Sequence, residues 1–305
     1  MSFYLAVDAG GTKTEYLLAT ETDEIARVRT GTIKRMRTDA ANATLNLETG
    51  LAELGSRTGV SMQSVTATCI GAAGSSVPLV ADWMQTAFAE RVGGSLSLVG
   101  DVEIALDAAF AGAPGVVAIA GTGSNVAGRD LRGNVRTVGG WGPALSDQAS
   151  GHRIGHQALR ALFLALDERR PTTLLEAVLR RWNMDGMQDL VGHANQLPPP
   201  DFSELAPEVV ACAAAGDPVA CSVLHREAEE MAHLIHLMIE QMRSVAADEH
   251  WLPEVAFAGS MLEYVPILRS SVVAALHRQT PGLKARPGVV DPILGALWRA
   301  RSSAK

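Results

Sequence analysis

The sequence has few cysteines, no excess of positive charge and no long apolar run. Its 305 residues contain three cysteines, Cys69, Cys212 and Cys221, which form no C-x-x-C or C-x-C pair. A disulfide scaffold, a zinc ribbon and a cysteine-ligated iron–sulfur cluster therefore lose support. The formal charge of -7, with 26 Lys and Arg against 33 Asp and Glu, provides no chain-wide positive field for a nucleic acid.

Signals for membrane insertion and secretion are also missing. No apolar run approaches the roughly 20 residues of a membrane span, and no basic region precedes the first apolar run at residues 3–7. We therefore expect a cytoplasmic protein that contacts neither a membrane nor a nucleic acid. With 47% hydrophobic residues, the chain is long and apolar enough for two globular domains.

Strand and helix patterns alternate in the first part of the chain. Strand-like runs occupy residues 3–7, 14–19, 65–70 and 96–99, and helical patterns occupy 40–55 and 78–92. This alternation predicts an α/β domain over about the first 110 residues. A further strand at 115–120, followed by a glycine-containing turn at 121–124, predicts a second α/β unit of similar design.

Helical patterns dominate the second half. They run from residue 151 to about 245 and are interrupted at 197–201 by three prolines. Gly216-Asp217-Pro218 predicts the end of one helix and the start of another, with Asp217 as N-cap. The stripe of Ala228, Met231, Ile235, Met238 and Met242 in that helix is interpreted as core rather than as a ligand groove.

The first candidate site is the turn Asp8-Ala9-Gly10-Gly11-Thr12-Lys13-Thr14. Adjacent glycines let backbone N–H groups approach an anion, and the Thr12 and Thr14 hydroxyls can donate to phosphate oxygens. Asp8 at the strand end can hold Mg²⁺ through water. The alternative is a plain hairpin turn, but the Asp and the Thr-Lys-Thr favour phosphate binding.

A second turn, Gly121-Thr122-Gly123-Ser124-Asn125, repeats this chemistry in the other half of the chain. Such a pair is what clamping the phosphates of a nucleotide requires. The P-loop pattern is absent from the chain, and no G-x-G-x-x-G follows the first strand.

Two further carboxylates have candidate roles. Asp101 follows a strand and can act as a general base for an acceptor hydroxyl during phosphoryl transfer, or as the N-cap of the next helix, or as both. Asp147 follows the loop Gly139-Gly140-Trp141-Gly142-Pro143, and carboxylates beside backbone amides suit the hydroxyls of sugars. The alternative is an ordinary loop with one buried Trp.

Together with Ala258-Gly259-Ser260 and Gly295-Ala296, these segments resemble, in order and spacing, the N-acetylglucosamine kinase branch of the BadF/BadG/BcrA/BcrD ATPase family. The resemblance covers essentially the whole chain. It implies an α/β protein with the actin-like ATPase (ribonuclease H-like) fold, in which two related domains surround a nucleotide cleft. The implied domains are residues 1–112 and 113–290, the second with helical insertions, and a final helix at 291–305 that packs back on the first.

The resemblance also implies ATP and Mg²⁺ as cofactors, a small-molecule sugar as substrate, and a homodimer. Asp101 would be the general base and Asp8 would position Mg²⁺. The nucleotide would be bound by Gly10, Gly11, Thr12, Lys13, Thr14, Gly121, Thr122, Gly123, Ser203, Gly259, Ser260 and Tyr264. The sugar would be bound by Arg35, Asp101, Ser124, Asn125, Gly140, Trp141, Gly142 and Asp147.

Two departures from the family pattern bear on the sugar. Lys34-Arg35-Met36-Arg37 stands where the family has an Asn that holds sugar hydroxyls, and ungapped counting puts Arg35 at that Asn. After Asp147 the family's Glu-Gly-Ser is Gln148-Ala149-Ser150. Both changes make the local charge more positive, which favours an acidic sugar. The alternative is that Asn42 serves instead and the basic cluster is solvated.

We therefore predict an ATP-dependent kinase that phosphorylates an amino sugar, foremost N-acetylglucosamine at its 6-hydroxyl. Glucosamine, N-acetylmuramic acid or another acidic sugar are alternative substrates. A non-catalytic sugar or ATP sensor and an ATPase coupled to a protein partner are the alternative functions.

Overall fold

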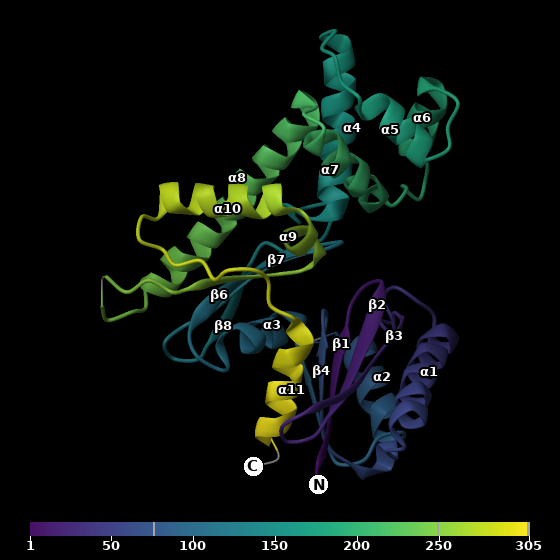
Figure 1. The fold of residues 1–305 in the computed structure, drawn as a ribbon, viewed down its shortest axis with the longest axis vertical. Coiled ribbons are helices and arrows are strands. Elements are labelled where there is room, and N and C mark those ends of the chain that lie inside the picture. Colours follow the sequence, from purple (N-terminus) through teal and green to yellow (C-terminus); the bar gives the residue numbers. More distant parts are fainter. Residues whose placement is uncertain (76, 249, 304–305) are drawn as a thin grey trace. The chain divides into compact units, whose positions relative to one another are not determined.

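The computed structural model describes residues 1–75, 77–248 and 250–303, and the chain forms two compact units (Figure 1). The first unit comprises Met1–Val117, Arg129–Val135 and Val290–Lys305. The second comprises Ala118–Gly128 and Arg136–Val289. Each unit is described by itself below.

The first unit is built on a five-stranded mixed sheet. Its elements are β1 (Phe3–Ala9), β2 (Lys13–Ala19), β3 (Glu24–Gly31), α1 (Ala40–Thr58), the 3₁₀ turn Met62–Ser64, β4 (Val65–Ala72), α2 (Pro78–Ala89), β5 (Ser95–Val99), α3 (Asp101–Phe110) and α11 (Pro292–Ser303). The strand order is β3-β2-β1-β4-β5. β1 and β2 pair antiparallel, as β2 and β3 do, whereas β1, β4 and β5 run parallel.

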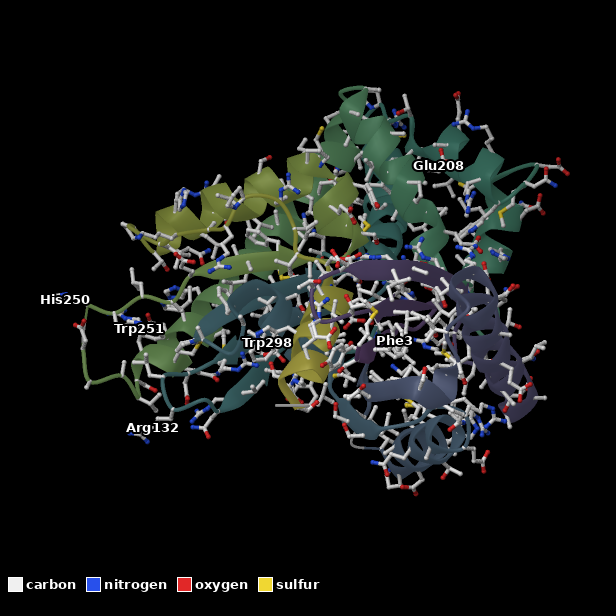
Figure 2. The ribbon with its side chains drawn as sticks, turned by 60° about the horizontal axis from the view of Figure 1, so that its bottom comes forward. Phe3, Arg132, Glu208, His250, Trp251 and Trp298 are labelled. Atoms are coloured by element: carbon white, nitrogen blue, oxygen red, sulfur yellow. The ribbon has the colours of Figure 1, made fainter. Side chains whose placement is uncertain are left out.

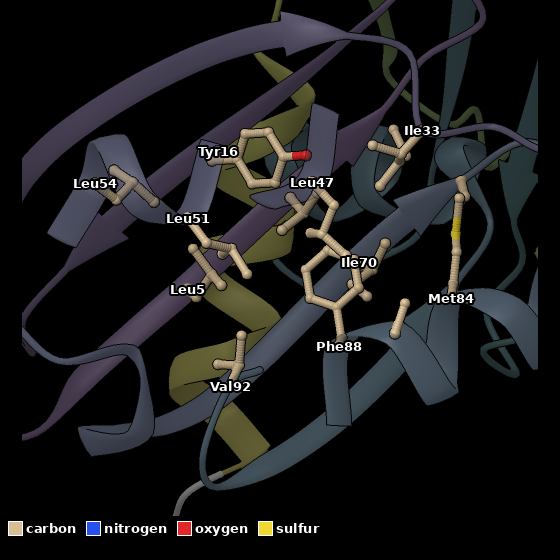
Figure 3. Packing of buried hydrophobic residues seen from close by; sticks show 14 of the residues in the cluster. Leu5, Tyr16, Ile33, Leu47, Leu51, Leu54, Ile70, Met84, Phe88 and Val92 are labelled. Atoms are coloured by element: carbon tan, nitrogen blue, oxygen red, sulfur yellow. The ribbon is translucent and has the colours of Figure 1, made fainter. Parts of the chain in front are cut away.

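Alternating side chains of β1 give this sheet two apolar faces. Leu5 and Val7 join a buried cluster with residues of α1 and α2, including Leu47 and Phe88 (Figure 3). Tyr4 and Ala6 join a second cluster with α3 and α11. Because a strand presents successive side chains to opposite faces, β1 is covered by helices on both sides (Figure 1).

The last helix, α11, belongs to the first unit. Trp298 (Figure 2) packs so closely on Gly112 that a Cβ there would lie 3.1 Å from its ring. Arg299 Nε donates to Asp107 Oδ2 at 2.7 Å, and Arg129 donates to Asp107 Oδ1 at 2.7 Å. Asp107 is buried, so these two guanidinium groups compensate a charge that would otherwise be costly to bury.

The second unit contains a four-stranded sheet and most of the helices. Its elements are β6 (Gly115–Ala120), whose first residues belong to the first unit, β7 (Ser124–Arg129), β8 (Val135–Val138), α4 (Gly151–Asp167), α5 (Leu174–Arg181), α6 (Met187–Ala194), the 3₁₀ turn Phe202–Leu205, α7 (Ala206–Ala214), α8 (Pro218–Arg243), β9 (Val255–Ala258), α9 (Ser260–Tyr264) and α10 (Pro266–Gln279). The strand order is β8-β7-β6-β9.

The long helix α8 confirms two predictions. Asp217 is its N-cap and accepts from the backbone N–H groups of Val219 and Ala220, both at 2.9 Å. All members of the predicted stripe are buried, which makes the stripe core: Ala228, Met231, Ile235, Met238 and Met242. Within the described ranges, no single helix is long and apolar enough to cross a bilayer; residues 202–214 and α8 reach that length only as a pair bent by 114°.

Candidate active site

One group of candidate residues lies at the carboxyl ends of β1, β4 and β5, in the first unit. Asp8 is in register with Gly71 of β4, and Gly71 is in register with Val99 of β5. Asp101 follows Val99 by two residues as the first residue of α3. Because parallel strands end at the same edge of a sheet, Asp8 and Asp101 are brought to one edge of the first unit.

Close packing of α3 on β4 positions Asp101. A Cβ at Gly71 would lie 2.2 Å from Ile104 Cδ1, so glycine is what lets α3 approach the strand. The N-cap is Gly100, whose N–H donates to Glu103 Oε1 at 3.2 Å. The alternative role of Asp101 as N-cap is therefore wrong by one residue: Asp101 is the first helical residue, and its Oδ1 accepts from Val102 N at 2.9 Å.

The pKa of Asp8 is raised to about 7, chiefly by burial and then by the nearby carboxylates of Asp101, Glu15 and Asp291, whereas Lys13 opposes the shift. Burial also raises the pKa of Asp101, against the opposing effects of the Val102 N–H and of Lys34. A divalent cation would relieve the repulsion around Asp8. No group of three or more His, Cys, Asp or Glu side chains in the described residues is arranged for a metal. The buried Asp8 carboxylate with Asp101, Glu15 and Asp291 nearby fits Mg²⁺, which binds through few carboxylates, waters and phosphate oxygens.

The segment after β3 is fastened to the first Gly turn. Thr32 Oγ1 donates to Gly10 O at 2.7 Å, and Lys34 N donates to Thr32 Oγ1 at 3.1 Å. This attachment holds Lys34 where its ammonium group interacts with Asp101, while burial lowers the pKa of Lys34. The basic cluster at 34–37 marked this segment in the sequence, but only the tertiary structure identifies Lys34 as the residue that interacts with Asp101.

Arg35 and Asn42 have other partners. The guanidinium carbon of Arg35 lies 6.0 Å from the ring centroid of Trp83, a cation–π arrangement. Its Nε is buried and, among the described residues, has no hydrogen-bond partner. Asn42 Nδ2 donates to Asp39 Oδ2 at 2.7 Å in the first turn of α1. Asn42 therefore interacts with the N-cap of α1.

The first Gly turn joins β1 to β2 in a hairpin. Gly11, Thr12 and Lys13 are exposed, and a Cβ on Gly11 would meet nothing within 4 Å. Thr14 differs: its side chain is buried, and its Oγ1 accepts from Ile33 N at 3.1 Å. The phosphate contact predicted for the Thr14 hydroxyl is therefore corrected to a positioning role, because that hydroxyl is already hydrogen-bonded to the backbone N–H of Ile33.

The second Gly turn is held by the first residues of α4. Gly121 N donates to Gly123 O at 2.8 Å, and Gly151 N donates to Gly121 O at 2.8 Å. Thr122 is exposed, and its carbonyl accepts from His152 N at 3.4 Å. The turn thus presents the Thr122 side chain from a backbone that is fixed on both sides.

Several residues predicted to bind the nucleotide gather around this turn. Gly259 has φ 90°, and a Cβ there would lie 2.4 Å from Ala120 O, so only glycine fits at the end of β9. A Cβ added to Gly121 would lie 3.8 Å from Ser260 Oγ, and a Cβ added to Gly151 would lie 3.6 Å from Ser203 Cβ. Tyr264, at the end of α9, is 71% exposed.

Residues predicted to bind the sugar also meet within the second unit. A Cβ on Gly140 would lie 2.6 Å from the Asn125 amide, and one on Gly123 would lie 3.1 Å from Asp147 Oδ2. Ser124 Oγ and Asn125 Oδ1 are buried and have no hydrogen-bond partner among the described residues. Buried polar atoms normally find partners, so these two suit the hydroxyls of a ligand.

The loop at 139–142 carries its aromatic side chain outward. Trp141 is 74% exposed, so the alternative of an ordinary loop with a buried Trp is wrong. Gly139, Gly140 and Gly142 have φ values of 76°, 70° and 90°, which glycine adopts without strain. The backbone bends here in a way that frees the Trp141 ring for stacking.

Comparison with known proteins connects this geometry to a family. A model of the BadF/BadG/BcrA/BcrD ATPase family matches residues 5–300. An N-acetylmuramic acid/N-acetylglucosamine kinase of Clostridium acetobutylicum is 25% identical over 310 residues, 99% of each chain. An N-acetyl-D-glucosamine kinase of Dictyostelium discoideum is 28% identical over 232 residues, 74% of this chain and 71% of that protein.

Solved structures show the same fold. The crystal structure of a Chromobacterium violaceum protein provisionally named N-acetylglucosamine kinase has a TM-score of 0.75 at 25% identity, covering 97% of this chain and 98% of that one. A ROK family glucokinase from Streptomyces griseus has a TM-score of 0.60 at 14% identity, covering 99% and 100%. The predicted actin-like ATPase fold is thereby confirmed.

Proposed function

The chain belongs to the BadF/BadG/BcrA/BcrD ATPase family, and from that membership we propose that it is an ATP-dependent kinase for an amino sugar, foremost N-acetylglucosamine at its 6-hydroxyl. One observation carries the proposal. Asp101 lies at the same strand-end edge as Asp8, and the two carboxylates interact electrostatically. A base beside a cation-binding carboxylate is the arrangement that transfer of a phosphoryl group to a hydroxyl needs.

In the proposed reaction, Asp101 takes the proton of the sugar hydroxyl while the oxygen of that hydroxyl attacks the γ-phosphorus of ATP. The bond from that phosphorus to the β,γ-bridging oxygen breaks, and ADP leaves. Burial raises the pKa of Asp101, which makes its carboxylate a stronger base than an ordinary aspartate. Mg²⁺, when bound through Asp8, supplies charge neutralisation for the phosphates.

The two Gly turns have matching roles in the proposal. The exposed hydroxyls of Thr12 and Thr122 bind ATP phosphates, with backbone N–H groups of the neighbouring glycines. Gly11 supports this role. Within the protein nothing requires glycine at this position, because its φ is not positive and a Cβ would meet no atom within 4 Å. A residue without Cβ at an open position suits the close approach of a ligand. We assign Ser203, Gly259 and Ser260 to the nucleotide as well, and Tyr264 on the same grounds of resemblance.

Sugar recognition is assigned to residues of the second unit. The buried oxygens of Ser124 and Asn125 would pair with sugar hydroxyls or the N-acetyl group, and Asp147 would accept from hydroxyls. The exposed ring of Trp141 would cover an apolar face of the sugar. Sugar kinases named among the relatives support this assignment.

An acidic amino sugar is a second candidate substrate. Lys34 interacts with Asp101, and Arg35 has a buried Nε with no partner among the described residues. Positive charge beside the base would attract a carboxylate on the acceptor sugar. The relative from Clostridium acetobutylicum is named for both N-acetylmuramic acid and N-acetylglucosamine.

The deciding experiment is ATP turnover with Mg²⁺ and a panel of neutral, amino, N-acetylated and acidic sugars. We expect stimulation by N-acetylglucosamine and a phosphate on its 6-hydroxyl by NMR. Stimulation only by N-acetylmuramic acid would favour the second candidate. ATP hydrolysis without any sugar, or no turnover at all, would contradict the kinase and leave the coupled ATPase or the sensor. Light scattering would test the homodimer that the family resemblance implies, and we place the reaction in the cytoplasm, where ATP is available.

A further inference from the structure

A single carboxylate is fully buried in the middle of α8. Glu227 is 0% exposed, and the residues around it on this helix, such as Ala228 and Met231, are apolar core. A charge in such surroundings needs partners to compensate its desolvation. These partners come from the strained loop before α4 and from α4 itself.

Arg153 of α4 and the backbone of Ala149 both donate to Glu227. Arg153 Nε lies 3.0 Å from Oε1 and 3.1 Å from Oε2, and Ala149 N lies 2.9 Å from Oε2. Arg153 also contacts Glu230, one turn further along α8. Burial raises the pKa of Glu227, whereas Ala149 N–H and Arg153 favour its charged form.

The backbone that Glu227 holds is strained. Asp147 has φ 91° and Ala149 has φ 62°, conformations that cost residues with a Cβ energy and persist only where surrounding contacts enforce them. Both residues are buried. Glu227 bonds directly to the N–H of one strained residue, and the other strained residue is the proposed sugar ligand Asp147.

We propose that Glu227 is a positioning residue that fixes the 147–149 backbone and thereby aims the Asp147 carboxylate at the sugar. This inference rests on the proposed function. Glu227 acts through Ala149, because both of its carboxylate oxygens already accept hydrogen bonds from Ala149 N and Arg153 Nε. It therefore touches no substrate and controls how well the acceptor sugar is held.

The test is the Glu227→Gln variant, which keeps the shape but puts an amide group against donors. Displacement of a substrate-positioning group by about 1 Å can cost up to roughly a hundredfold in rate, so we expect kcat/KM for the sugar to fall by about tenfold to a hundredfold, mainly through a higher sugar KM. The KM for ATP should stay near the wild-type value. The matched control is Glu230→Gln, which weakens a contact to the same Arg153 without touching Ala149 and should leave the sugar KM unchanged.

A second substitution tests the strain directly. Glycine adopts the Ala149 conformation without penalty, so Ala149→Gly in the Glu227→Gln background should restore part of the sugar affinity. An equal effect of Glu227→Gln in both backgrounds would overturn the proposal. So would a sugar KM in Glu227→Gln that matches Glu230→Gln, or an equal rise of the KM values for sugar and ATP.

Two further measurements keep the proposal testable. If Glu227→Gln does not fold, Arg153→Lys keeps the charge but loses the Nε bonds, and it should raise the sugar KM selectively; equal rises in both KM values would overturn the inference. If the wild-type protein phosphorylates no sugar, the proposed function fails. Hydrogen exchange at the Ala149 amide then tests, without any sugar, whether Glu227 holds the backbone at Ala149. Exchange that is as slow in Glu227→Gln as in the wild type would overturn this part of the proposal.

Discussion

The two Gly turns share a pattern and differ in what holds them. Thr12 and Thr122 are both exposed, and each is followed two residues later by a buried hydroxyl, that of Thr14 or Ser124. Thr14 Oγ1 accepts from the backbone N–H of Ile33, whereas Ser124 Oγ has no partner among the described residues. The same sequence pattern therefore gives a structural hydroxyl in one unit and a candidate ligand contact in the other.

The chemistry beside the two turns differs as well. The first turn lies at a sheet edge with interacting charges, namely Asp8, Asp101 and Lys34. The second turn is fixed by backbone hydrogen bonds from α4, next to the strained residue Asp147. We infer that the first unit supplies charge and proton transfer, and the second supplies fixed geometry for binding.

The largest effect should come from the base of the first unit. Asp101→Asn removes the proton acceptor, and loss of general-base catalysis typically lowers kcat by roughly 10²–10⁴-fold. The KM values for ATP and sugar should change little, as steady-state kinetics would show. Asp147→Asn in the second unit is the matched comparison and should mainly raise the sugar KM. A wild-type kcat in Asp101→Asn would remove Asp101 from its role.

Gly11→Ala tests whether phosphates approach the first turn. The new methyl group meets nothing within 4 Å in the chain, so the thermal midpoint should stay unchanged. If ATP phosphates lie against Gly11, overpacking should cost about 1–3 kcal/mol of ATP affinity, measured by calorimetry. Gly259→Ala is the contrast: its Cβ would lie 2.4 Å from Ala120 O, so it should lower the midpoint. Unaltered ATP affinity in Gly11→Ala would argue against phosphate contact there.

The two buried hydroxyls should respond in opposite ways. Thr14→Val keeps the shape but leaves the buried Ile33 N–H without its acceptor, which should cost about 1–3 kcal/mol in the free energy of unfolding. Ser124→Ala removes a hydroxyl with no partner among the described residues, so urea unfolding should change little while the sugar KM rises. Equal losses of stability in both variants would contradict the difference between the turns.

The smallest effect concerns Lys34. Its positive charge lowers the pKa of Asp101, so Lys34→Met should raise that pKa further. Asp101 must be unprotonated to act as a base, and kcat/KM therefore falls as the pH drops through its pKa. The acid limb of the pH profile should shift to higher pH in Lys34→Met, and less in the control Arg35→Met. An unchanged acid limb in Lys34→Met would show that the two groups are not coupled in catalysis.

Local signals in the sequence anticipated much of the fold. The Asp217 cap, the Met-containing stripe of α8 and the hairpin before Thr14 follow from propensity and periodicity, which act between near neighbours. Helix ends were less exact: α1 extends to Thr58, past the predicted residue 55, and α2 ends at Ala89, before residue 92. Boundaries depend on weak capping contacts, so pattern alone places them poorly.

The sequence by itself determined the two Gly turns, the carboxylates Asp8, Asp101 and Asp147, and the family to which the chain belongs, because these depend on residue types in a fixed order. Only the tertiary structure decided that Thr14 is buried, that Lys34 interacts with Asp101, and that Glu227 holds the strained Ala149. Glu227 lies 78 residues from Ala149 in the chain. Such contacts form by packing of distant helices and strands, and no local pattern records which distant group a side chain meets.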